Sequence, residues 1–573
     1  MSAVEILLAG AIFALLVTGL AGTYLYGQES AMVGGSRIRA VLSAQEGIEV
    51  TRNIRDENYT NLVDGTYGIA TSTSQWSFSG VSDLFGGNTR AVTISSPGTN
   101  RKLISSAVTW QQNIQRTGSV SLVTYLTNWR AIATAAVKNG LLIYGDGTAT
   151  PKSREYDATT NTFDPQASVL LATTSTTFIV RTSPSSTEAI LGFVNQSGVL
   201  TVACYNGTTW TQEWTATVAG TNVSRRFDIA YETNSGDVMV LYGTDTVSAN
   251  ELAYRTKPGS AGCGSGNWAA ITNISAARTN GKIDYVRMAW DRRASSNLIT
   301  AMWADTQADV SALVWSGTTW SNEPTTVSET TLDLIAFAQD IENIDLEYES
   351  LSGDLMMVWG KVVGNGANGV RYRTCTGGTA ACTWSGILTP ATFLDDATSL
   401  DISANPNSDQ IVFASVGKNQ SDLQLGYWSG TAWTNTANAD TSSNPPAAGM
   451  KQIATGWLVN GATSRSVITY GDQGSNALDW YTGALGVFTK QTDITMVPAG
   501  VNPYGYRNFE MNPLSKDQLM MVFSDSNFDL FAKRLVMSAA GAFTWTNSDS
   551  PSALSTTLTQ NVTSPFTFAF WRR

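Results

Sequence analysis

The pattern of hydrophobic and polar positions changes twice along the chain. Residues 6–26 carry no charge and are mostly apolar, which is long enough for a helix that crosses a bilayer. Beyond them, apolar residues recur at mostly helical spacings with charged residues between. This predicts an amphipathic continuation of the same helix to about residue 58. The apolar positions of the continuation are Ile38, Val41, Leu42, Ile48 and Ile54.

Four glycines mark where this helix is expected to be weak. Gly19 and Gly22 lie in the apolar part, and Gly34 and Gly35 lie between the two parts. Glycine has a low helix propensity because it loses the most backbone freedom on folding. We therefore predict a kink or a soft spot at these positions.

Residues 59–130 read as a small antiparallel sheet. Three runs, TRAVTISS, RKLISSAVTWQQ and GSVSLVTYLTNW, alternate apolar and polar residues, as half-buried strands do. A short linker at residues 131–138 separates this head from the rest of the chain.

The remaining residues, 139–573, repeat themselves. A small turn followed by tryptophan recurs as NGTTW, SGTTW and SGTAW, ending at Trp210, Trp320 and Trp433. Trp210 and Trp545 are 335 residues apart, which is six intervals of about 56 residues. A second landmark, an acidic turn before a continuous apolar strand as in SGDVMVLYG, keeps the same period. Repeats of this length with four short strands each are typical of β-propeller blades. We expect the tryptophans to pack blade edges rather than to bind sugars.

The blade count follows from the starts of the units and from the strands that remain. Strand-like segments are left over before the first unit and at residues 564–573. Joined, they make one further blade, because closing the ring removes exposed strand edges. The sequence therefore predicts an α+β helix-and-sheet module followed by an all-β propeller of eight blades, with seven as the alternative. Seven full units begin near Thr176, Phe227, Tyr285, Ile344, Leu400, Gln452 and Asn508.

Glu5 is out of place in an apolar segment. No basic residue precedes Arg37, whereas a secretory signal opens with Lys or Arg. A long helix that is apolar first and amphipathic later, with Glu at the fifth position, resembles the mature type IV pilins and pseudopilins. Met1 departs from the usual Phe of that family, and the middle of the helix has no Pro.

The resemblance covers about the first 130 residues and carries several expectations. It implies that a leader is removed before Met1, whose amine is then methylated, and that the Glu5 carboxylate pairs with the amine of a neighbouring subunit. It also implies an inner-membrane precursor, an extracellular filament built from copies of the chain, and the pilus assembly machinery as a partner. A plain membrane anchor with a chance glutamate is the alternative.

Composition narrows the candidate chemistry. The net charge of −11 argues against nucleic acid as a partner. Histidine is absent, which excludes a Ser-His-Asp triad and a zinc site with His ligands. The small charged fraction of 14% and the 18 tryptophans suit an all-β secreted protein.

The cysteines and one acidic turn are the remaining candidate sites. Cys375 and Cys382 flank a flexible spacer and are expected to form a disulfide in an oxidising environment. Cys204 and Cys263 then pair by elimination, and four free thiols are the alternative. The segment DSNFD is a weak calcium candidate that strand-turn chemistry explains more simply. Its residues are Asp525, Asn527 and Asp529. We expect no other cofactor.

No catalytic residue can be assigned from the sequence. The turns lack the Asp of a sialidase Asp-box, and no arginine cluster that would hold a carboxylate stands out. We therefore predict a pilin-like filament subunit that displays a propeller for adhesion or for binding a surface ligand or glycan. One alternative is a membrane-anchored propeller enzyme acting on glycans, which an acid pair in the propeller channel would favour. Another is a minor pseudopilin of a secretion system.

Overall fold

The chain divides into two compact units, Met1–Ala135 and Ala136–Arg573, in a computed structural model. The structure describes residues 2–72, 75–98, 101–113, 115–128, 138–169, 175–218, 225–247, 250–274, 281–332, 343–364, 367–390, 393, 395–417, 422–441, 451–471, 477–495, 505–548, 553–559 and 564–572. Met1 and nearly all of the expected linker at 131–138 lie outside these residues.

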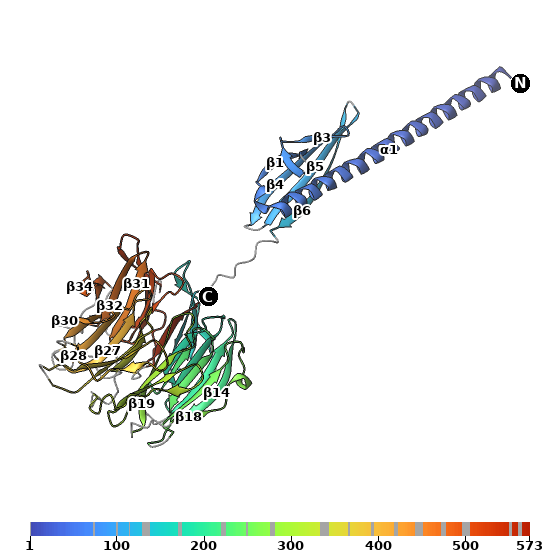
Figure 1. Ribbon diagram of the computed structural model, residues 1–573. Helices are drawn as coiled ribbons and strands as arrows, with labels where there is room; N and C mark the ends of the chain where they lie inside the picture. Colours follow the sequence, from blue (N-terminus) through green and yellow to red (C-terminus); the bar gives the residue numbers. More distant parts are fainter. Residues whose placement is uncertain are drawn as a thin grey trace. The chain divides into compact units, whose positions relative to one another are not determined.

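A single long helix, α1 (Ala3–Glu57), opens the first unit, as the sequence pattern predicts (Figure 1). The helix begins after Ser2, whose hydroxyl accepts a hydrogen bond from the backbone N–H of Val4. It ends at Asn58, whose backbone is extended, and a short 3-10 helix, η1 (Tyr59–Asn61), follows. The α-helix runs without a break through all four glycines at which the sequence suggests a kink, because no side chain or proline interrupts its hydrogen bonds.

The second half of α1 packs on an antiparallel sheet. Its buried residues, which include Ala44, Gly47 and Ile54, recur every three or four positions. A Cβ atom on Gly47 would lie 2.4 Å from Ser106 Oγ, so only glycine permits this close approach of helix and sheet. The sheet order is β2-β1-β4-β5-β6, with β3 paired to β4. The strands are β1 (Gly65–Ser72), β2 (Gln75–Ser79), β3 (Asp83–Phe85), β4 (Asn88–Gly98), β5 (Arg101–Asn113) and β6 (Arg116–Thr127).

The second unit consists of small antiparallel sheets, eight of them among the described residues. One combines β7 (Gly140–Tyr144), β8 (Lys152–Asp157), β9 (Thr162–Phe163) and β10 (Ala167–Ser168) with the last strand, β40 (Phe566–Phe570). The next three are β11 (Ser175–Thr182), β12 (Ala189–Asn195), β13 (Val199–Tyr205), β14 (Trp210–Thr217); β15 (Phe227–Tyr231), β16 (Val238–Gly243), β17 (Leu252–Lys257), β18 (Thr272–Ile274); and β19 (Ile283–Trp290), β20 (Ile299–Asp305), β21 (Val310–Trp315), β22 (Trp320–Ser321). A 3-10 turn, η2 (Ser265–Asn267), precedes β18.

The other four sheets follow in chain order. They are β23 (Ile344–Tyr348), β24 (Leu355–Gly360), β25 (Val370–Thr376), β26 (Thr383–Trp384); β27 (Ala397–Ala404), β28 (Ile411–Gly417), β29 (Leu423–Trp428), β30 (Trp433–Asp440); β31 (Ile453–Asn460), β32 (Thr463–Tyr470), β33 (Ala477–Ala484), β34 (Val487–Lys490), β35 (Ile494–Thr495); and β36 (Arg507–Met511), β37 (Gln518–Ser524), β38 (Leu530–Met537), β39 (Phe543–Asn547).

These sheets form a ring with the architecture of a β-propeller (Figure 1). The innermost strands contact one another in the closed cycle β40, β11, β15, β19, β23, β27, β31, β36 and back to β40. Strand β40 pairs antiparallel with β7, so the two ends of the unit complete one sheet. This is the pairing that the leftover strands of the sequence predict, and it leaves no open edge between the first and last sheets.

Packing between sheets explains the two sequence landmarks. The continuous apolar strands are buried along their whole length, as in β16 and β24, because a neighbouring sheet covers each face. The fourth-strand tryptophans pack on aromatic rings of the third strand, with centroids 5.5 Å apart both for Trp315 and Trp320 and for Trp428 and Trp433. The acidic turns bind backbone: Asp237 accepts a hydrogen bond from Gly259 N–H at 2.8 Å.

Candidate ligand-binding cavity

Glu5 lies in the first turn of α1 and interacts within its own chain. The backbone N–H of Ser2 donates to Glu5 Oε2 at 2.9 Å, and with the Ser2 hydroxyl this forms a capping box. The structure therefore gives Glu5 a local role that the sequence interpretation did not consider. Its predicted pairing with the amine of another subunit involves Met1, which lies outside the described residues.

The helix around the four glycines is exposed. Every residue from 2 to 34 is exposed within the single chain, and no atom lies within 4 Å of a Cβ added at Gly19, Gly22 or Gly34. At Gly35 the nearest such atom is Arg39 Nη2, at 4.0 Å. The glycines therefore have no packing role inside this chain.

Both cysteine pairs are joined in the structure. Cys375 and Cys382 close a loop at the end of β25, with a sequence separation of 7. Cys204 of β13 and Cys263 are 59 residues apart, and their disulfide connects two neighbouring sheets of the ring. Glu188 lies near Cys204 and Cys263, but both thiols are used by the disulfide and the Glu188 carboxylate bonds Lys257 Nζ at 2.7 Å. This cluster is therefore structural.

The DSNFD segment folds as a turn between β37 and β38. Asp525 Oδ1 accepts hydrogen bonds from the backbone N–H groups of Asn527 and Asp529, at 2.9 and 2.8 Å. Phe528 takes a positive φ of 64° to complete the turn. These contacts supply the strand-turn explanation, and they occupy one oxygen that a calcium ion would need.

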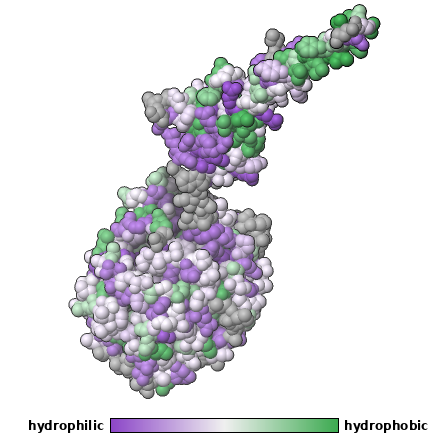
Figure 2. Space-filling view, turned by 90° about the vertical axis from the view of Figure 1, so that its right-hand side faces the viewer, coloured by the Kyte–Doolittle hydropathy of each residue, from purple (hydrophilic) through white to green (hydrophobic). Residues whose placement is uncertain are grey.

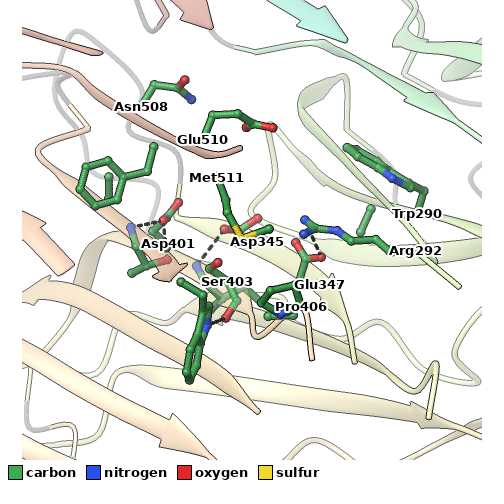
Figure 3. Close-up of a pocket in the computed structure, with 18 of the residues that line it drawn as sticks. Trp290, Arg292, Asp345, Glu347, Asp401, Ser403, Pro406, Asn508, Glu510 and Met511 are labelled. Carbon is green, nitrogen blue, oxygen red and sulfur yellow. Dashed lines mark hydrogen bonds and ion pairs between the residues drawn. The ribbon is translucent and has the colours of Figure 1, made fainter. Parts of the chain in front are cut away.

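One cavity of the second unit lies at the mouth of its central channel and has a volume of about 430 Å³. It is lined by the ends of the innermost strands and the turns that follow them (Figure 3). Its size falls in the range of roughly 300–1,000 Å³ that small-molecule sites occupy. Seven cationic and four acidic side chains line it, although the whole chain carries a net charge of −11.

Carboxylates on the channel wall connect adjacent innermost strands. Asp345 of β23 accepts hydrogen bonds from the Arg287 guanidinium of β19 at 2.6 and 3.1 Å and from Ile402 N–H of β27 at 3.1 Å. Asp401 of β27 likewise accepts a hydrogen bond from Thr455 N–H of β31, at 2.7 Å. These acids have defined structural partners, which makes the wall rigid.

Asp228 of β15 makes the same connection between neighbouring innermost strands. It accepts a hydrogen bond from Met288 N–H of β19 at 2.9 Å and forms an ion pair with Arg225 at 2.7 Å. Burial by itself raises the pKa of Asp228, but the charges of Arg225, Arg181 and Arg287 outweigh burial and hold that pKa below its ordinary value. Asp228 therefore stays ionised and structural.

Three arginines surround one tryptophan at the cavity. The guanidinium carbons of Arg572, Arg181 and Arg292 lie 4.7, 5.6 and 5.9 Å from the ring centroid of Trp290. Arg292 also forms an ion pair with Glu347 at 3.2 Å. Among the described residues Arg572 forms no ion pair, and Arg181 reaches Asp228 only at 3.8 Å.

Two glutamates extend into the same space. Figure 3 shows Glu347 of β23 beside Arg292, and Glu510 of β36 approaching from another side of the cavity. Burial raises the pKa of Glu347 above its ordinary value, and the nearby Arg292 opposes this effect. Burial lowers the pKa of Arg572 to about 10, and the like charge of Arg292 acts in the same direction. The cavity thus holds Glu347 and Arg572 partly away from bulk water, whereas Arg292 is exposed.

The sequence interpretation missed this arginine cluster. Arg181, Arg292 and Arg572 are spread over almost 400 residues of sequence, and ring closure alone brings them together. A signal was present, however. Arg181, Glu347 and Glu510 all lie at or next to the last residue of an innermost strand, so aligning the units strand by strand would have placed them at one level of the channel.

No protein-family model and no curated protein sequence matches the chain. Among solved structures, the chain is similar to the BP39L lectin from Burkholderia pseudomallei, with 14% identity over 66% of this chain and 99% of the lectin, and a TM-score of 0.44. It is also similar to the fucose-specific lectin from Aleuria aurantia, with 14% identity over 57% and 97% of the two chains and a TM-score of 0.31. A third match is the polysaccharide lyase Uly1, with 9% identity over 65% and 90% and a TM-score of 0.36. Similarities at this level carry no argument about ligand or activity.

Proposed function

We propose that this chain is a subunit of a type IV pilin-like surface filament and that its ring is an eight-bladed propeller that binds a ligand at the cell surface. The filament role is supported mainly by the apolar half of α1, which is not buried within the chain. The N-terminal part of the helix passes the length and hydropathy criteria for a membrane span, and none of its apolar stretch is buried inside the chain (Figure 2).

The exposed apolar surface is too large to face water. More than ten large hydrophobic side chains between Val4 and Leu25 are 46% or more exposed. Burying a side chain of this kind gains about 2 kcal/mol, so covering the stretch gains on the order of 20 kcal/mol. A bilayer covers it in the precursor, and the helices of neighbouring copies cover it in the filament. Assembly uses the pilus machinery that the family resemblance implies.

The surface continues beyond the membrane-length segment. Ile38 and Leu42 are 64% and 60% exposed and lie one turn apart, although this part of α1 already packs on the sheet with its opposite side. A lone membrane anchor does not need an apolar stripe at this level. Helices of neighbouring copies, packed along their length, would bury it.

Two substitutions at the start of the helix test the filament role. In Glu5→Ala cells we expect the protein in the membrane fraction but at least a tenfold loss of filaments by electron microscopy. Ser2→Ala is the matched control, because it removes the hydroxyl of the capping box at a cost of about 1 kcal/mol while keeping the carboxylate. Normal piliation in Glu5→Ala, or equal loss in both variants, would contradict pairing between subunits.

A second candidate function is cleavage of a glycan in the cavity. It is favoured by Glu347 and Glu510 lining one space, with the pKa of Glu347 raised by burial, because a carboxyl that keeps its proton closer to neutral pH can act as a general acid. To establish this activity, the unaltered protein should release reducing ends from a glycan, and the Glu347→Gln variant should bind the same glycan without cleaving it. Binding without any product supports the binding role.

A further inference from the structure

The arginine cluster around Trp290 is only partly neutralised by carboxylates of the described residues: Arg292 pairs with Glu347 at 3.2 Å, Arg181 lies 3.8 Å from Asp228, and Arg572 has no carboxylate partner there. Gathering like charges costs free energy, and burial adds to that cost because it removes water from the guanidinium groups. Arg287 and Arg292 each have a carboxylate partner among the described residues, whereas Arg572 has none. Arg181 Nε is buried and has no hydrogen-bond partner among those residues. An anion in the cavity would give Arg572 a partner and would add a compensating charge near Arg181, whose side chain is 22% exposed.

The form of the cluster favours a planar anion. A guanidinium presents its N–H donors as a flat fork that matches the two oxygens of a carboxylate. Lysine, which binds anions as a point charge, is absent from the group around Trp290. Three guanidinium groups gathered around one ring place their charge in a small region, where a carboxylate can pair with more than one of them.

The other cavity groups suit a polyhydroxylated ring. Glu347 and Glu510 offer acceptors for hydroxyl groups, and Asn508 lies beside Glu510 (Figure 3). Ser403 adds a further polar group to the wall. A cavity of about 430 Å³ accommodates a small polar molecule or the end of a chain, but not a folded partner.

We propose that this cavity binds the carboxylate-bearing sugar residue of an acidic glycan, with Arg181, Arg292 and Arg572 holding the carboxylate and with Glu347 and Glu510 accepting hydrogen bonds from ring hydroxyls. The proposal rests on the binding role of the ring and deepens it, because it names the ligand class. The chain as a whole is acidic and repels such a glycan, so recognition depends on this local excess of cations.

The test is calorimetric titration of the full chain in detergent with three matched probes. These are a galacturonate tetrasaccharide, the same tetrasaccharide with its carboxyl groups reduced to alcohols, and a sulfated galactose tetrasaccharide. We expect the galacturonate to bind at least tenfold more tightly than the reduced form and more tightly than the sulfated one. Preference for the sulfated probe would overturn the assignment of carboxylate, and equal binding of the reduced form would overturn the role of charge.

Variants locate the site. Arg572→Gln and Arg292→Gln should each weaken galacturonate binding by tenfold or more. Lys282→Gln is the control, because it removes the same charge from an exposed surface pair with Asp245, outside the cavity, and should change affinity less than twofold. Arg292 is 37% exposed, so we expect its replacement to leave the fold intact. The Arg292→Gln variant therefore still tests the site if Arg572→Gln lowers the melting temperature. Unchanged affinity in both arginine variants would place the ligand elsewhere.

Failure of the acidic-ligand proposal can be distinguished from failure of the binding role of the ring. If a neutral glycan binds and the cavity variants weaken that binding, the binding role of the ring stands and only the proposal of an acidic ligand is refuted. If no glycan of any charge binds the full chain, while filaments still form, then the binding role of the ring is itself wrong.

Discussion

The two units of this protein bury their apolar surface in different ways. In the first unit, half of α1 packs on the sheet through residues such as Ala44 and Ile54, and the other half is exposed, with none of the described residues packed on it. In the second unit, the last strand returns to pair with the first, and the sheets cover one another around the whole ring. The first unit therefore leaves a large apolar surface exposed, whereas the sheets of the second unit cover one another and close into a ring.

Breaking the ring closure should have the largest effect. Deleting residues 564–573 removes β40, uncovers the hydrogen-bonding edge of β7 and should abolish the cooperative melting transition of the second unit. The point variant Phe568→Ala, at a side chain that is 1% exposed and packs on Tyr156 and Phe570, should cost about 3–5 kcal/mol in free energy of unfolding.

Val487→Ala is the control for that variant, because Val487 lies in the same unit and is 69% exposed. Its free energy of unfolding should change by less than about 0.5 kcal/mol, as measured by denaturant titration. Equal effects of the two substitutions would show that β40 does not hold the ring together.

Removing the disulfides should have a smaller, graded effect. The loop-closure model gives about 4 kcal/mol for the 59-residue separation of Cys204 and Cys263 and about 2 kcal/mol for the 7-residue separation of Cys375 and Cys382. Replacing each pair by serine and comparing the melting temperatures checks this order. A larger loss from the short loop would mean that contacts at the hairpin, rather than chain entropy, decide its contribution.

The helix glycines should have the smallest effect on the monomer and a separate effect on assembly. Gly34→Ala should stabilise the isolated chain's helix by about 0.5–1 kcal/mol, because alanine has the higher helix propensity and a Cβ there meets nothing within 4 Å. Circular dichroism in detergent measures this gain. If neighbouring helices approach closely at Gly34 in the filament, the same variant should lower the filament yield, and Gln28→Ala, at an exposed position nearby, should not.

Local patterns in the sequence were enough to predict the long helix, the strands and the repetition of the β unit. The change from an apolar run to helical spacing predicted α1 to within one residue of its end, since backbone hydrogen bonding and amphipathicity act over a few residues. Starts near Phe227 and Ile344 coincide with β15 and β23, because each unit repeats its own turn and strand chemistry. The capping contact between Ser2 and Glu5 was also readable locally, and the sequence interpretation overlooked it.

What the sequence could not reveal is which distant side chains share one space. It showed the arginines at 181, 292 and 572 only as separate residues at strand ends, and it gave no reason to expect them around Trp290. Their meeting depends on ring closure, which brings the first and last innermost strands into contact. The sequence by itself therefore determined a helix with an apolar half and a repeating β unit. The tertiary structure alone decided the charge and shape of the cavity, because long-range contacts place groups that no local pattern relates.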